Sequence, residues 1–159
     1  MFIPFLPTGG RVIADDGTAI LPRYDQPGLL ARPGMEPEPF PVAHADLLVI
    51  SADGARILYV RDGLRLLNLR TNEDRLVFAA GDGVYRNLSM SDDGERVLFL
   101  LGGHAHVIQT DSTGLRALTS HPSETIQKAI LSGNGRIAYA VTSRARLIKI
   151  DAGTGEQTE

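Results

Sequence analysis

Two histidines, His104 and His106, are separated by a single residue in the segment GGHAH. On a β-strand, alternate residues point to the same face, so both imidazoles could contribute to one metal site. No third ligand lies nearby in the sequence, and His106 takes a position that Arg65 and Arg146 take in two related segments. We therefore expect a generic polar position, with no metal and no other cofactor bound.

A second group with possible chemistry consists of acidic or amide residues that each directly precede a glycine. These residues are Asp16, Asp53, Asp93 and Asn134. Brought together they would form a ring of carboxylates, but beside a glycine such a side chain commonly bonds to the backbone of its own turn. Serines at positions 51, 91 and 132 precede the same turns, and none belongs to a G-x-S-x-G elbow. We expect turn chemistry here and no catalytic set.

The composition excludes several classes of protein. The chain has 159 residues, no cysteine, and 16 Lys and Arg against 19 Asp and Glu. The basic residues are scattered, whereas binding to nucleic acid needs a concentrated positive field. No apolar run approaches the ~20 residues that span a bilayer. The first residues, MFIPFLPTGG, contain no basic segment and no phosphate-binding or dinucleotide motif follows, so neither a signal peptide nor nucleotide binding is predicted.

An internal repeat organises the elements that carry these residues. The glycines at 54, 94 and 135 lie 40 and 41 residues apart, and each is followed by a similar segment: RILY from Arg56, RVLF from Arg96 and RIAY from Arg136. The third copy matches the other two only if one residue is deleted after its glycine. A second block repeats in step, with starts at Leu64, Ala105 and Ala145. Two blocks with one period establish a repeat architecture.

Each unit is predicted to form short antiparallel strands joined by tight turns. Asp-Gly and Asn-Gly pairs favour hairpin turns, and connections this short cannot join parallel strands. In the first clear unit we expect four strands near 46–50, 56–61, 64–70 and 74–79. The segment RVLFLL is apolar on both alternating faces, so both faces must be covered. Without convincing helices, the sheets must cover one another, which predicts an all-β fold of β-propeller blades.

Two alternatives to this fold stay open. In the segment 123–131, Ile126 and Ile130 lie four residues apart, which would suit a short helix. The repeat register instead favours a strand over 126–131. A β-solenoid is also repetitive, although its coils are usually shorter than this period.

The pattern S-x-D-G-x-R-I-x-[YF] resembles the WD40-like repeats of TolB-type bacterial propellers and of the propeller domains of prolyl-oligopeptidase-type hydrolases. The resemblance covers residues 44–159. Its recurrent positions are turn and core residues, so it implies the fold far more than an activity. It also implies a protein or peptide partner and a periplasmic or extracellular location, although the chain itself carries no recognisable signal peptide.

The units divide the chain unevenly. Eight of the nine prolines precede residue 42, so 1–43 is predicted to be a degenerate or edge blade with a proline-rich excursion, with a linker over 27–43 as the alternative. Blades are expected at 44–83 and 84–124, and an incomplete blade at 125–159. Closed propellers usually have four to eight blades. We therefore expect these three and a half to four blades to self-associate or to meet missing blades of a longer chain, without inserting into a membrane.

Partners of propellers usually bind the loops that enter the innermost strands, around the mouth of the central channel. By register these loops lie at 43–46, 83–86 and 122–127. Their polar residues are the binding candidates, although ordinary solvated loops would have the same composition. The candidates are His44, Asp46, Tyr85, Arg86, His121, Glu124 and Gln127.

These features favour a non-enzymatic binding or scaffold propeller that recognises a protein or peptide partner through the mouth loops. One alternative is the propeller domain of a larger prolyl-oligopeptidase-like hydrolase. A lactonase-like enzyme would need carboxylates and amides that converge in the channel to bind a metal. The sequence indicates no such set.

Overall fold

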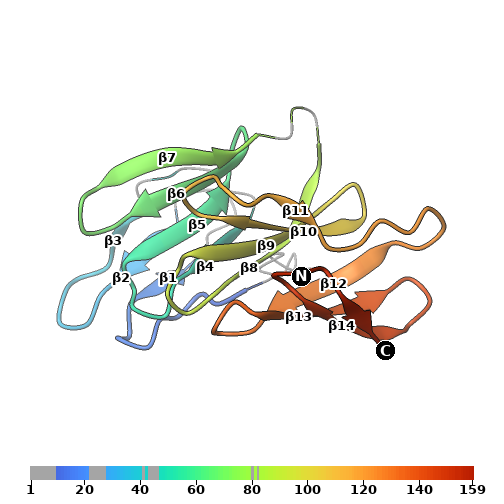
Figure 1. Ribbon diagram of the computed structural model, residues 1–159. Helices are drawn as coiled ribbons and strands as arrows, with labels where there is room; N and C mark the ends of the chain where they lie inside the picture. Colours follow the sequence, from blue (N-terminus) through green and yellow to red (C-terminus); the bar gives the residue numbers. More distant parts are fainter. Residues whose placement is uncertain (1–9, 22–27, 41, 43–46, 80, 82) are drawn as a thin grey trace, which may run out of the picture.

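Antiparallel β-sheets make up the structure (Figure 1), a computed structural model that describes residues 10–21, 28–40, 42, 47–79, 81 and 83–159. Sheet 1 contains β1 (Ala19–Leu21), β2 (Leu29–Ala31) and β3 (Glu38–Pro39). Sheet 2 contains β4 (Leu48–Ile50), β5 (Arg56–Val60), β6 (Leu64–Asn68) and β7 (Glu73–Phe78). Sheet 3 contains β8 (Tyr85–Met90), β9 (Arg96–Leu101), β10 (His104–Gln109) and β11 (Arg116–Ala117). Sheet 4 contains β12 (Ile126–Leu131), β13 (Ile137–Thr142), β14 (Leu147–Asp151) and β15 (Gln157–Thr158).

The all-β prediction is confirmed, and both alternatives to it are wrong. The described residues contain no helix, and the segment 123–131 carries β12. Every strand pairs with its sequence neighbour in an antiparallel meander, which a solenoid of parallel coils would not do. Part of the stretch 27–43, for which a linker is the alternative, forms β2 and β3. Sheet 4, where an incomplete blade is expected, has a fourth strand of two residues, β15.

The turn before the second strand of sheets 2, 3 and 4 is built by one hydrogen-bond pattern. In sheet 3, the Ser91 hydroxyl donates to the Asp93 carboxylate at 2.6 Å and accepts the Arg96 N–H at 3.0 Å. The same carboxylate accepts the Glu95 N–H at 2.9 Å. Gly94 completes the turn with a φ of +69°, which glycine adopts without strain. The serines and acidic residues of the repeat therefore serve the turn, as expected.

The third copy of the repeat has no deletion, and the alignment of Arg136 with Arg56 and Arg96 is wrong. The Ser132 hydroxyl accepts the N–H of Ile137, five residues later, just as the Ser91 hydroxyl accepts that of Arg96. Ile137 thus takes the arginine position, and Arg136 takes the preceding one. Turn geometry rather than the similarity of RIAY to RVLF decides the register.

The second repeated block is also displaced in its third copy. Leu100 on β9 pairs with Ala105, whereas Val141, the residue of β13 that corresponds to Leu100, pairs with Leu147. The position of Ala105 is therefore taken by Leu147 and not by Ala145. By the same register His106 corresponds to Ile148. Arg146 therefore precedes β14 and does not occupy the position of His106.

Three clusters of buried apolar side chains fill the spaces between consecutive sheets. Sheets 1 and 2 share a cluster around Ile20 and Tyr59, sheets 2 and 3 one around Leu58 and Phe99, and sheets 3 and 4 one around Leu98 and Ala140. The second strands of sheets 2 and 3, β5 and β9, are consequently buried on both faces. Figure 1 shows the resulting order, with sheet 2 between sheets 1 and 3 and sheet 4 beyond sheet 3. Burial on both faces is what the run RVLFLL predicts.

A ladder of backbone hydrogen bonds, here called the turn ladder, also joins the sheets. The Asp15 N–H donates to the Ala52 carbonyl at 2.8 Å, the Ala52 N–H to the Asp92 carbonyl at 3.1 Å, and the Asp92 N–H to the Gly133 carbonyl at 2.7 Å. These four residues occupy the same position in their turns. The ladder has a direction, because each sheet donates to the next.

The innermost strands of sheets 2, 3 and 4 lie side by side, with β4 against β8 and β8 against β12. The Asn87 side-chain amide donates to the Ala129 carbonyl at 2.6 Å, and the Ser89 hydroxyl accepts the Leu131 N–H at 2.9 Å. Side chains therefore substitute for a continuous backbone ladder between these strands. Their first residues come together at one end of the sheets.

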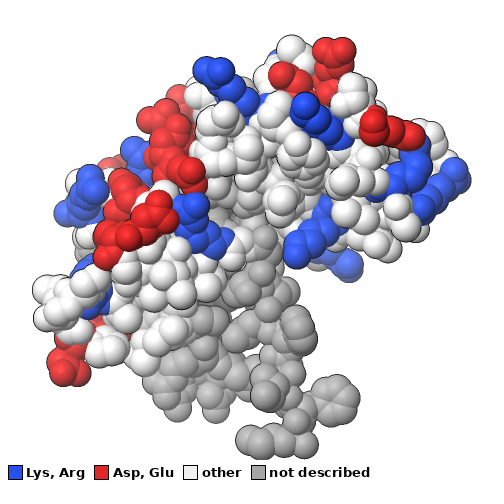
Figure 2. Space-filling model, turned by 90° about the horizontal axis from the view of Figure 1, so that it is seen from below, with Lys and Arg blue, Asp and Glu red and all other residues white. Residues whose placement is uncertain are grey.

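Charged side chains of both signs are interspersed along the upper part of the surface seen in Figure 2. This agrees with the scattered charge of the sequence, in which the net charge is −3. Within the described part of the chain, the structure has no helix that could cross a membrane.

Candidate functional site

The mouth candidates that the structure describes lie at the beginnings of β8 and β12. Tyr85 and Arg86 open β8, His121 and Glu124 lie in the connection that leads to β12, and Gln127 is the second residue of that strand. The two remaining candidates, His44 and Asp46, lie outside the described residues.

Tyr85 belongs to the packing of sheets 2 and 3 more than to a binding surface. Its hydroxyl donates to the Phe78 carbonyl at 3.1 Å, and its ring centroid lies 5.7 Å from that of Phe99. Gln127 is exposed and sits in the register shift between Ile126 and Lys128. Neither residue lines one of the pockets at this end of the sheets, described next.

His121 and Glu124 line the first of these pockets, called the ion-pair pocket, with a volume of about 300 Å³. It lies between the connection that leaves sheet 3 and the β13–β14 hairpin. Its other lining residues are Thr119, Ser120, Pro122, Ile126, Thr142, Arg146, Ile148 and Gln157. His121 is held by its own loop, since its Nδ1 atom accepts the Ser123 N–H at 3.3 Å. Hydroxyl, amide, imidazole and charged groups thus surround one concave space.

A bidentate ion pair dominates the electrostatics of this pocket. The Arg146 Nε atom donates to Glu124 Oε1 at 3.2 Å and its Nη2 atom to Glu124 Oε2. The Glu124 side chain is 3% exposed, whereas that of Arg146 is 43% exposed. Arg146, with a further hydrogen bond from Thr142, lowers the pKa of Glu124 to about 2, and Glu124 raises the pKa of Arg146. The carboxylate is therefore ionised and fixed in place at neutral pH.

This pKa predicts acid sensitivity with a definite sign. The unfolded chain should bind a proton at Glu124 near the ordinary value of 4.5, but the folded chain only near a pH of about 2. The stability contributed by the pair should be complete above about pH 4.5 and lost as the pH falls toward about 2. An NMR titration of the Glu124 carboxyl carbon should show this low midpoint. In Arg146→Gln the midpoint should move up toward 4.5, and an ordinary midpoint in the wild type would contradict the ion pair.

Arg86 lines a second pocket, called the arginine pocket, of about 350 Å³. Its walls are largely apolar, and Ile126 belongs to both pockets. The remaining lining residues are Val84, Leu100, Gly102, Gly103 and Thr125. The Arg86 side chain is exposed and is absent from the ion pairs within the described residues. It can therefore offer its guanidinium group to an anionic group of a partner.

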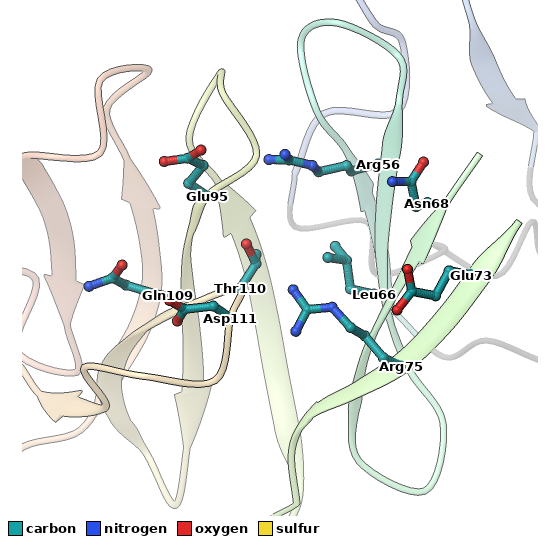
Figure 3. Close-up of a pocket in the computed structure, with 9 residues that line it drawn as sticks. All are labelled: Arg56, Leu66, Asn68, Glu73, Arg75, Glu95, Gln109, Thr110 and Asp111. Carbon is teal, nitrogen blue, oxygen red and sulfur yellow. The ribbon is translucent and has the colours of Figure 1, made fainter. Parts of the chain in front are cut away.

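A third pocket, here called the rim pocket, lies between sheets 2 and 3 and has a volume of about 340 Å³ (Figure 3). Arg56 and Arg75 extend toward sheet 3, where Glu95 and Asp111 face them. Arg56 is already engaged, because its Nη1 atom donates to the Asp93 carbonyl at 2.7 Å. Hydrogen bonds from Thr113, together with the charge of Arg75, lower the pKa of Asp111. Charges of opposite sign from sheets 2 and 3 therefore face each other across this pocket.

The His106 side chain packs on its cross-strand neighbour Phe99. The His106 ring stacks on Phe99 with centroids 5.6 Å apart and an interplanar angle of 18°. Its Nδ1 atom lies 3.1 Å from the His104 carbonyl, and burial lowers the pKa of its imidazole. Within the described ranges, no three His, Asp or Glu side chains are grouped as a metal would require.

His121, Glu124 and Arg86 are candidates from the sequence that line these pockets, whereas Arg146 is not among the candidates. The sequence alignment paired Arg146 with His106, a generic polar position, because it placed the third copy of the second block in the wrong register. The rim pocket was missed as well, because its residues come from two sheets, and most belong to repeated segments that indicate the fold rather than a site.

Comparison with solved structures identifies the architecture. A protein described as TolB from Agrobacterium tumefaciens matches with a TM-score of 0.69 at 18% identity, over 92% of this chain and 59% of that chain. Oligogalacturonate lyase from Vibrio parahaemolyticus matches with a TM-score of 0.72 at 10% identity, over 97% of this chain and 51% of that one. The chain has the β-propeller fold. Identities this low show the fold alone, and the propeller described here spans about half the length of these two chains.

No family model and no curated protein matches the propeller sequence. The sheets are its blades, and β4, β8 and β12 are the innermost strands of blades 2, 3 and 4. The arginine pocket and the ion-pair pocket therefore lie at the end of the blades where the innermost strands begin, whereas the rim pocket lies between blades 2 and 3.

Proposed function

We propose that this propeller is a non-enzymatic binding or scaffold module that recognises a protein or peptide partner through the loops at its channel mouth. One observation carries the proposal: Arg86 and the Glu124–Arg146 pair line two adjoining mouth pockets that share Ile126. Concave sites of this kind combine apolar walls with a few placed polar groups.

The two pockets offer different chemistry to one extended segment. In the arginine pocket, Val84, Leu100 and Ile126 can pack against an apolar side chain while the Arg86 guanidinium group pairs with a neighbouring carboxylate. In the ion-pair pocket, Arg146 is already paired with Glu124, and the Gln157 side-chain amide donates to the Leu118 carbonyl. The Ser120 hydroxyl and the His121 Nε2 atom are the lining groups that can bind peptide backbone groups. A segment that carries an acidic residue beside an apolar one fits both pockets.

Selection from a library of random peptides displayed on phage tests this proposal. Peptides enriched on the purified chain should carry an acidic residue next to an apolar one. Calorimetry with one such synthetic peptide should show a dissociation constant at least tenfold higher for Arg86→Ala than for the wild type. This corresponds to a loss of about 1.4 kcal/mol or more of binding free energy. Arg75→Ala, at the rim pocket, is the matched control and should bind like the wild type.

Two outcomes would overturn the proposal. Enriched peptides that bind Arg86→Ala as tightly as the wild type would move the site away from the mouth. Binding of trigalacturonate without any peptide binding would favour a role in an enzyme, as in the oligogalacturonate lyase of similar fold. A G-x-S-x-G elbow with a later Asp and His, encoded downstream in the same gene, would instead support the alternative, the propeller domain of a larger prolyl-oligopeptidase-like hydrolase.

A further inference from the structure

Sheet 4 presents an apolar face that no other sheet of the described chain covers. Four of its side chains are exposed to between 37% and 59% of their full area, an unusual value for strand residues of this size. They are Ile130, Tyr139, Val141 and Leu147. Cross-strand pairing places them together, since Tyr139 pairs with Ile130 and Val141 with Leu147. This set is called the open face of sheet 4.

The corresponding positions of sheet 3 are buried against sheet 4. By strand register, Tyr139 corresponds to Leu98, Val141 to Leu100 and Leu147 to Ala105, and the counterparts are 0%, 2% and 0% exposed. In the propeller, this side of a blade is therefore the one that packs on the following blade. The open face of sheet 4 therefore resembles the face of a blade that packs on a following blade, but no following blade covers it among the described residues.

Sheet 1, at the other end of the series of four sheets, also presents an apolar face. Its open face consists of two cross-strand rows of apolar residues. These are Ile13, Ala19 and Ala31 in one row and Leu21, Leu29 and Pro39 in the other. Ile13 is 61% exposed and Leu21 is 47% exposed, whereas Ile20, on the opposite face, is 1% exposed and packs on sheet 2.

The turn ladder gives these two ends opposite polarity. Each sheet donates a turn N–H to the carbonyl of the following sheet. At the ends of the described ladder, the Gly133 N–H has no acceptor and the Asp15 carbonyl has no donor among the described residues. A donor end and an acceptor end are complementary to each other, whereas two copies of either end are not. Head-to-tail pairing of sheet 4 with sheet 1 would therefore continue the ladder with the same hydrogen bonds.

We propose that two copies of this chain close one ring, with the open face of sheet 4 in each copy packed on the open face of sheet 1 in the other. The chain has four sheets and covers 51% and 59% of the two solved propellers, so two copies together have about the length of one such propeller. Eight blades lie within the range of closed propellers. The two junctions are identical by symmetry, which makes the assembly a closed dimer.

Sedimentation equilibrium of the purified chain and three variants tests the arrangement. Leu147→Asp alters the open face of sheet 4, Leu21→Asp alters that of sheet 1, and Leu115→Asp is the control, because Leu115 is 48% exposed outside both faces. We expect a dimer for the wild type and the control. Each of the other variants should raise the dimer dissociation constant by about 30-fold or more, since a buried charge without a partner is introduced into both junctions.

Mixing the two weakened variants distinguishes this pairing from others. A mixed dimer contains one junction with both substitutions and one with neither, so an equimolar mixture should dimerise more strongly than either variant alone. This rescue also shows that both variants are folded. A wild-type monomer up to near-millimolar concentration, an open series of higher oligomers, or an unweakened Leu21→Asp dimer would each overturn the proposal. The first would mean that another chain segment or another protein covers these faces.

Discussion

Phe99→Ala should lower the free energy of unfolding by about 3–5 kcal/mol. The Phe99 side chain is fully buried between blades 2 and 3, where its ring lies 5.6 Å from Phe78 and 5.7 Å from Tyr85, centroid to centroid. Removing it leaves a cavity that three surrounding rings, including His106, cannot fill without losing their own packing. Urea denaturation followed by circular dichroism measures this loss.

Leu76→Ala is the control for this substitution. Leu76 is 45% exposed on β7, the outermost strand of its blade, and its truncation should change the free energy of unfolding by about 0.5 kcal/mol or less. Equal losses in the two variants would mean that Phe99 is not part of a close-packed junction.

Gly94→Val should destabilise the propeller by about 3 kcal/mol. Gly94 has a φ of +69°, a conformation that a β-branched residue strongly resists. Its added Cβ atom would also lie 3.0 Å from Arg56 Cδ and 3.1 Å from Ser51 Cβ, both in the preceding blade. The substitution therefore strains a turn and separates two blades at once, and thermal denaturation should report a clear fall in midpoint temperature.

Gly102→Val separates these two effects. Gly102 has a similar φ of +60°, but a Cβ atom there would meet nothing within 4 Å. Its cost should be that of backbone strain alone, and so smaller than that of Gly94→Val. If the two substitutions cost the same, crowding between the blades contributes nothing at Gly94.

The fold was predictable from the sequence because the repeat carries the turn chemistry and the strand pattern together. Asp-Gly turns with a fixed spacing indicate hairpins, and apolar residues on both faces of RVLFLL require neighbouring sheets. The register of the third copy was harder to predict, since the match of Arg136 with Arg96 looks better than the correct one. The distance from Ser132 to Ile137 would have resolved it, because this serine hydroxyl accepts the N–H five residues later in every copy.

The site was only partly predictable, for a related reason. Glu124 could be proposed from its place in a mouth loop, but its partner Arg146 comes from the β13–β14 turn, 22 residues later. Pairing at that separation depends on how two loops meet across a blade, and no local pattern encodes it. Arg86 could be proposed because the start of an innermost strand is fixed by the repeat.

The turn ladder makes the blades interchangeable at their junctions. It joins backbone N–H and carbonyl groups, so Asp15, Ala52, Asp92 and Gly133 fill the same role with four different surroundings. A junction made by backbone groups does not depend on the chemistry of the side chain at that position. Gene duplication or recombination can therefore add, remove or exchange a whole blade while its junction hydrogen bonds are kept. The side chains of the mouth loops are then free to diverge from blade to blade, so that one ring can carry different chemistry around its channel.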